Sequence, residues 1–257
     1  MNTAAGQPAR AEDHPAQAAA GAELLSHLGH ALRSPLNSIL GFTQILALDR
    51  MNPLSAVQKE RVDQIQTAGW QLLQLIDDMV DLARIEAGHS SIARAPVALE
   101  PPMRESLAQF ASQVAAGRIQ LDPGAHLDGV VAGDAARLRQ ALVSVLGGAL
   151  RCVLRGGSLL IGARRQAGGG ALVWIRDSAQ SLPAGQLERT FLPLGRRPLD
   201  DGPGQGVQIG LALAQKLIEQ MGGRLRVHCD PQAGSELQIE LAGPGGPKEP
   251  PLHRASG

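Results

Sequence analysis

The strongest constraint in this sequence is a repeat of apolar residues that alternates steps of three and four through the first fifth of the chain. It can be followed at Leu25, Leu28, Leu32, Pro35, Ile39, Phe42 and Leu46. Such spacing places its members on one side of an α-helix and forms the seam along which two helices pack. We therefore expect a long helix from Ala22 whose apolar side is covered by other helices.

A second helical run follows a break at residues 51–53. Its apolar residues are Val62, Ile65, Leu72, Ile76 and Met79, and the stripe is widened by Leu73 and Val80. A hairpin of two such helices covers only half of each apolar stripe, and pairing two hairpins into a four-helix bundle covers the rest. We therefore expect segment 22–90 to be a helical hairpin that forms a homodimer.

The segment from about 95 to 243 changes to alternating helices and short strands. Helical patterns cover 132–153 and 206–221, and strand-like runs cover 158–163, 171–176, 225–229 and 236–241. A sheet covered on one face by helices is the architecture that this order favours. The fold class is therefore α+β, a helical hairpin followed by an α/β sandwich. Residues 1–21 and 244–257 lack any period, and we expect a disordered leader and tail there.

Composition excludes several function classes. The 24 basic residues are balanced by 24 acidic ones, and aromatic residues make up only 2% of the chain, which argues against a nucleic-acid partner. The two cysteines, Cys152 and Cys229, cannot build a disulfide framework or a four-ligand zinc site, and we expect no metal site. No secretory signal and no apolar run long enough for a membrane span is present, so we expect a cytoplasmic protein.

His30 falls on the side of the first helix that faces away from the seam. Pro35, five residues later, removes a backbone hydrogen bond from the turn near His30 and is expected to kink the helix. An exposed imidazole beside a weakened turn is accessible to a reaction partner.

The residues around His30 resemble the phospho-acceptor box of sensor histidine kinases: residues 30–37 read H-A-L-R-S-P-L-N, and 39–42 read I-L-G-F. Segments 81–88, 133–142, 191–194, 210–213 and 222–224 are similar, in order, to further motifs of that family. The resemblance implies a dimerisation and histidine-phosphotransfer hairpin followed by an ATP-binding sandwich of the Bergerat type. It also implies that His30 accepts a phosphoryl group, and that the face with Arg33, Ser34 and Asn37 docks the receiver domain of a response regulator.

The nucleotide pocket that this resemblance implies is incomplete. The metal-binding Asn of the family is Gly148 here, which offers no side-chain oxygen to Mg²⁺. Glycines of the two glycine boxes are replaced by Ala179, Ser181 and Gln208, and the acidic residue after the histidine is Ala31. The retained pocket residues are the adenine-reading Asp177, Gly206, Gly210 and Arg151, the last as a basic substitute for lysine.

Three functions remain open. The favoured one is a histidine phosphotransferase that exchanges a phosphoryl group between response-regulator aspartates through His30. The reason is that the five replaced positions all serve the reaction with ATP, whereas the acceptor His30 is retained. The second is a working histidine kinase that autophosphorylates from ATP. The third is a non-enzymatic pseudokinase that docks a receiver domain. On the favoured hypothesis no cofactor is needed, ATP and Mg²⁺ bind only if the pocket works, and an upstream sensor kinase can be a further partner.

Overall fold

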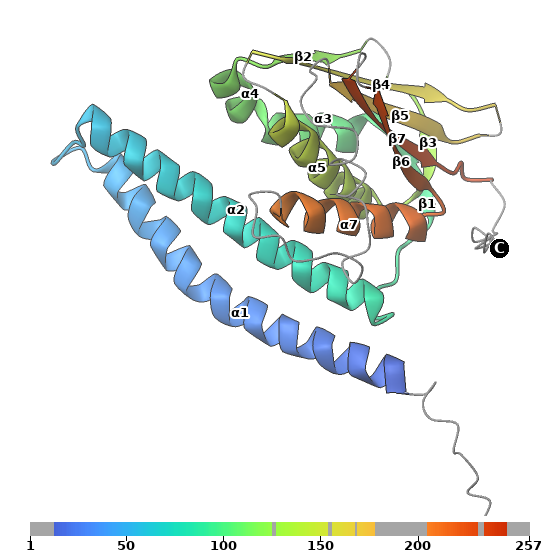
Figure 1. Cartoon of the computed structure of the whole chain (residues 1–257), viewed down its shortest axis with the longest axis horizontal. Coiled ribbons are helices and arrows are strands. Elements are labelled where there is room, and N and C mark those ends of the chain that lie inside the picture. The colour runs from blue at the N-terminus through green and yellow to red at the C-terminus, as the bar shows by residue number, and fades with distance from the viewer. Residues whose placement is uncertain are drawn as a thin grey trace, which may run out of the picture. The chain divides into compact units, whose positions relative to one another are not determined.

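The computed structural model describes residues 13–124, 127–153, 156–167, 169–177, 205–230 and 234–245. The chain divides into two compact units, with the boundary between Ser90 and Ser91 (Figure 1). Among the helices of this described part, none is both long enough and apolar enough to cross a membrane.

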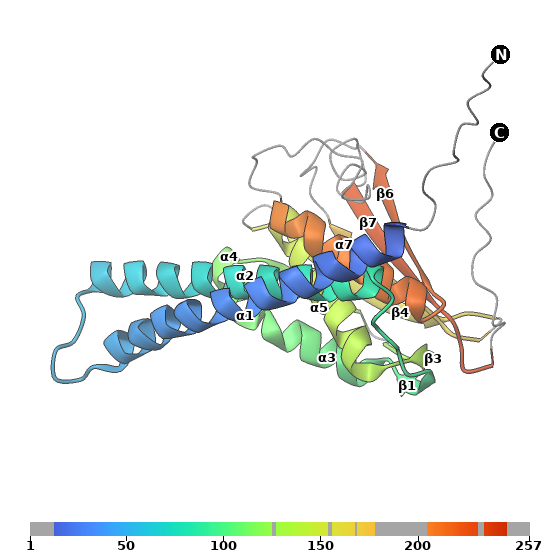
Figure 2. The ribbon, with the colours of Figure 1, turned by 90° about the horizontal axis from the view of Figure 1, so that it is seen from below.

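The first unit is a hairpin of two long antiparallel helices, α1 (Asp13–Leu48) and α2 (Ala56–Glu86), which lie side by side (Figures 1 and 2). The prediction of a disordered leader over 1–21 is wrong in its second half, because α1 already begins at Asp13. The helix also continues through Pro35 without interruption. A capping box starts α2: Gln58 N donates to Ser55 Oγ over 3.3 Å, and Ser55 N donates to Gln58 Oε1 over 2.9 Å.

The contact between the helices runs along a line of mostly small residues on α1 spaced seven apart. Its members, all buried, are Ala22, Gly29, Leu36 and Thr43. A β-carbon on Gly29 would lie 2.7 Å from Val80 Cγ2 of α2, and one on Gly69 of α2 would lie 2.7 Å from Leu40 Cδ2 of α1. Two glycines, one on each helix, therefore allow the helices to approach more closely than side chains would permit.

The apolar seam predicted for the first helix lies outside this contact. Its large members remain exposed to the following fractions: Leu28 48%, Leu32 51%, Ile39 51%, Phe42 68% and Leu46 49%. The neighbouring line with Leu36 and Leu40 packs against Ile76 and Leu73 of α2 instead. The hairpin by itself thus leaves an apolar stripe uncovered.

The second unit contains two sheets. The larger sheet has five strands in the order β2 (Gln120–Pro123), β4 (Ser158–Arg165), β5 (Ala171–Asp177), β7 (Gly234–Leu241) and β6 (Arg224–Asp230). Strands β2 and β4 are parallel, and the other pairs are antiparallel. The smaller sheet pairs β1 (Ala95–Ala98) with β3 (Val130–Gly133).

Helices α3 (Glu100–Gln109), α5 (Ala135–Cys152) and α7 (Gln205–Gln220) cover one face of the large sheet, and α4 (Ala111–Gly117) follows α3 (Figure 1). The core between sheet and helices includes Leu142, Leu146, Ile161, Ile175, Leu217 and Ile239, all fully buried or nearly so. The predicted fold class, a helical hairpin followed by an α/β sandwich, is confirmed.

One predicted boundary in this unit is wrong. Ala132 and Gly133, placed by sequence at the start of a helix, lie in strand β3. Helix α5 starts only after Asp134, whose Oδ1 accepts hydrogen bonds from Ala136 N at 2.9 Å and Arg137 N at 3.1 Å. This is an N-cap, which fixes the first turn and ends the preceding strand.

The close approach at Gly29 can be tested against a second glycine of the same helix. Gly29→Ala should destabilise the protein by about 1–3 kcal/mol, because its methyl group would overlap Val80 in a packed contact. Gly41→Ala has nothing within 4 Å of the new methyl group, and should stabilise by about 1 kcal/mol through helix propensity alone. Urea unfolding followed by circular dichroism measures both. Equal effects would contradict the close contact.

Candidate functional site

His30, Ser34 and Asn37 form an exposed face on α1. They are spaced four and three residues apart, so they lie one above another on the helix surface, and all three side chains are exposed. This placement agrees with the prediction that His30 faces away from the apolar seam. The face can therefore present an imidazole nitrogen to a second protein.

The turn that carries His30 has an altered hydrogen-bond pattern. Pro35 has no N–H and cannot donate to the carbonyl of Ala31, the residue after His30. One turn further on, Ser38 Oγ donates to the carbonyl of Ser34 over 3.1 Å. The backbone immediately after the histidine is therefore held by one hydrogen bond fewer than in an uninterrupted helix.

Arg33 lies differently from the other three predicted residues of this face. Its side chain is half-buried and reaches α2, where Nε donates to Asp77 Oδ1 over 2.7 Å and Nη2 lies 2.6 Å from the same oxygen. A second cross-helix contact joins Arg84 Nη2 to Ser26 Oγ over 2.9 Å. Sequence reasoning missed Ser26, Asp77 and Arg84, because only the register of the hairpin brings Asp77 to Arg33 and Arg84 to Ser26.

All four retained pocket residues lie in described helices or strands, and burial is described for two of them, Asp177 and Gly210. Asp177 is buried at the end of β5, and Gly210 is buried in the second turn of α7. Gly206 lies in the first turn of α7, and Arg151 lies near the end of α5. Ala179, Ser181 and segment 191–194 lie outside the described residues.

Gly148 occupies a helix–helix contact. It is buried in α5, and a β-carbon there would lie 3.3 Å from Leu211 Cδ2 of α7. One turn earlier on the same helix, the buried hydroxyl of Ser144 has no hydrogen-bond partner among the described residues. A single neutral hydroxyl and a glycine do not form a Mg²⁺ site, since this ion prefers carboxylate and carbonyl oxygens. The residues present on α5 therefore do not fit the metal.

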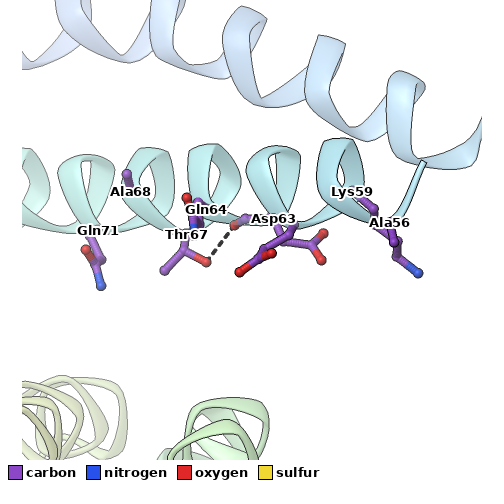
Figure 3. Close-up of a pocket in the computed structure, with 8 residues that line it drawn as sticks. Ala56, Lys59, Asp63, Gln64, Thr67, Ala68 and Gln71 are labelled. Carbon is purple, nitrogen blue, oxygen red and sulfur yellow. Dashed lines mark hydrogen bonds between the residues drawn. The ribbon is translucent and has the colours of Figure 1, made fainter. Parts of the chain in front are cut away.

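A shallow hollow lies along the solvent-facing side of α2 (Figure 3). Its lining residues all belong to that helix and include Lys59, Asp63, Thr67 and Gln71. Thr67 Oγ1 donates to the carbonyl of Asp63 over 2.8 Å, a hydrogen bond within the helix. These groups form an ordinary polar helix face, and we assign no ligand site to them.

Comparison with known families assigns both units. Residues 22–88 match the family model of the His Kinase A (phospho-acceptor) domain. Residues 133–244 match that of the histidine kinase-, DNA gyrase B- and HSP90-like ATPase. His30 lies within the first match, and Asp177, Gly148 and Gly210 lie within the second.

Individual relatives are similar over most of this chain. The circadian input-output histidine kinase CikA of Synechococcus elongatus is 29% identical over 227 residues, which cover 86% of this chain and 30% of CikA. The sensor protein GacS of Pseudomonas syringae pv. syringae is 28% identical over 226 residues, covering 85% of this chain and 24% of GacS. The chain thus spans less than a third of the length of these curated relatives.

A solved structure extends this likeness to three dimensions. The crystal structure of full-length ShkA in complex with AMPPNP has a TM-score of 0.62 and 26% identity, and covers 86% of this chain and 47% of ShkA. The histidine kinase AdeS of Acinetobacter baumannii, with a TM-score of 0.53 and 17% identity over 83% of this chain and 97% of AdeS, shares the fold. With two family domains in the same order, the chain belongs to the sensor histidine kinase family.

Proposed function

We propose that this chain is a histidine phosphotransferase of two-component signalling, which exchanges a phosphoryl group between His30 and the aspartates of response-regulator receiver domains. The observation that carries the proposal is the contrast between two helices. On α1 the acceptor histidine is exposed with Ser34 and Asn37 beside it. On α5 the metal-binding position of the family is Gly148, packed against Leu211.

The proposed reaction needs only a nucleophile from this chain. The unprotonated ring nitrogen of His30 supplies the electron pair for a new N–P bond. The bond between phosphorus and the aspartyl oxygen of the receiver breaks, and its electron pair remains on the released carboxylate. The receiver supplies the metal for this step, so the missing oxygen at Gly148 and the missing acid at Ala31 do not prevent it.

An autophosphorylating kinase is the second candidate function. It is favoured by membership of the ATPase family, by the retained Asp177, and by ShkA, whose structure is a complex with AMPPNP. Four replacements in the ATP pocket argue against a kinase: Gly148, Ala179, Ser181 and Gln208. Phosphoryl transfer from ATP depends on charge neutralisation and positioning at those positions. A docking pseudokinase is the third candidate, and it differs from the first only in leaving His30 unphosphorylated.

The exposed apolar stripe supports a homodimer. Leu32, Ile39 and Phe42 of α1 and Leu72 of α2 are about half exposed or more. Soluble monomers rarely expose a continuous apolar stripe of this kind, and a second hairpin would cover it in a four-helix bundle. A receiver domain and, upstream, a sensor kinase are the other partners of the proposed function.

The phosphotransfer proposal predicts which histidine is labelled. A receiver domain phosphorylated with radiolabelled phosphate should transfer label to the wild-type protein, and His30→Ala should abolish this transfer. His27→Ala, a change at another exposed histidine of α1, should leave it intact. Acid-labile label on the His30→Ala variant would identify the wrong acceptor, and no label on wild type would favour the docking pseudokinase.

The replacements around the ATP site predict weak, metal-independent nucleotide binding. Titration calorimetry with a non-hydrolysable ATP analogue should show the same low affinity with and without Mg²⁺, because Gly148 offers the metal no ligand. Gly148→Asn supplies an oxygen and requires Leu211 to move, since the new β-carbon would lie 3.3 Å from Leu211 Cδ2; any gain in affinity it brings should depend on Mg²⁺. A low-micromolar, Mg²⁺-dependent dissociation constant for wild type would instead establish the kinase.

The dimer proposal predicts different outcomes for two buried-charge variants. Leu32→Asp places a carboxylate in the stripe and should give a monomer with its helices intact, because the stripe lies outside the α1–α2 contact. Ile76→Asp places the charge in the core of the hairpin and should unfold it. Light scattering and circular dichroism distinguish these results. A wild-type monomer at micromolar concentration would rule out the dimer.

A further inference from the structure

We propose that Arg33 and Arg84, one from each helix of the hairpin, form an anion site that holds the phosphoryl group on His30. The inference rests on the proposed phosphotransfer function and adds to it the residues that bind the transferred group. It concerns the hairpin alone.

The two arginines bracket His30 along the helix axis. Arg84 reaches from α2 to Ser26, which lies four residues before His30. Arg33 lies three residues after it. Residues three and four apart are neighbours on a helix surface, with β-carbons about 5–6 Å apart. The two contacts therefore place one arginine before His30 and one after it along α1, both at positions where α1 meets α2.

The antiparallel register of the hairpin produces this placement. Opposite pairs of residues are Ser26 with Arg84, Gly29 with Val80, and Arg33 with Asp77. Because Gly29 has no side chain, the helices are close together one residue before His30. This proximity lets an arginine of α2 reach the acceptor side of α1.

Asp77 orients Arg33 and leaves some of its N–H donors unused. Asp77 interacts with its Nε and Nη2. The remaining terminal nitrogen, Nη1, lies 3.9 Å from the position that a β-carbon would take on Gly29, the residue before His30. A guanidinium group has five N–H donors, and one partner does not exhaust them. Asp77 acts here as a positioning residue.

Arg84 brings a charge that its partner does not neutralise. Ser26 is a neutral acceptor, and no ion pair of Arg84 is formed within the described part of the chain. A phosphoryl group carries close to two negative charges and three acceptor oxygens, which match the planar fork of arginine. Arg84 also lies in the last turn of α2, where a cation suits the helix dipole. The test must separate this stabilising role from anion binding.

Phosphoramidate, a small anionic phosphoryl donor, tests the site without any receiver domain. The full chain is loaded on His30, and the second-order rate of loading is followed by ³¹P NMR. Arg84→Gln and Arg33→Gln should each lower this rate about tenfold, the value of one charge-assisted hydrogen bond. Arg84→Lys keeps the positive charge but loses the planar guanidinium group, so its loading rate should lie between those of wild type and Arg84→Gln.

Arg61→Gln is the matched control, since Arg61 is an exposed arginine of the same helix α2 and lies 23 residues before Arg84. Its loading rate should equal that of wild type. Added sodium chloride should slow loading of wild type and Arg61→Gln to the same extent, and should slow loading of Arg84→Gln less, because one of the two arginines is missing. A purely structural role would change the melting temperature without changing this salt dependence.

The results distinguish the anion site from the proposed function. Loading of the glutamine variants at the wild-type rate, or no loading of wild type, would overturn the anion site. Normal loading by phosphoramidate with no exchange to any phosphorylated receiver would overturn the phosphotransferase and leave the anion site standing.

Discussion

The close contact between α1 and α2 at Gly29 and Gly69 is the constraint on which the rest of the hairpin depends. With no β-carbon at either position, Val80 and Leu40 fill the space against bare backbone. This contact sets the register that pairs Arg33 with Asp77 and Arg84 with Ser26. It also turns Leu32 and Phe42 outward, where they remain exposed. The surroundings of His30 and the uncovered stripe thus share one cause.

The sequence was sufficient for the two-part fold and for the exposure of His30, because heptad spacing and acceptor motif both depend on local order along the chain. It did not reveal which of two lines of residues along α1 packs against α2. The seam through Leu28 and Leu32 has the larger apolar residues, yet the line through Gly29 and Leu36 packs against α2. Helices approach where side chains are small, and hydrophobicity alone does not reveal that preference.

The contacts of the candidate site were unpredictable for a related reason. Arg33 could be placed on the acceptor helix from its spacing to His30, but Asp77 and Arg84 come from a helix more than forty residues away. Strand β3 was missed because Ala132 and Gly133 continue smoothly into the helical pattern of α5. Only the Asp134 side chain, by capping the helix, separates the two elements.

The glycine contacts also determine how the hairpin can move. Sliding α1 along α2 by one residue, about 1.5 Å, would begin to carry Val80 from Gly29 toward neighbours that have β-carbons. Leu40 would likewise leave the space above Gly69 at the other contact. Both glycine contacts therefore oppose axial sliding of α1 along α2. The spacing of the two glycines, one on each helix, thus favours a single register of the hairpin.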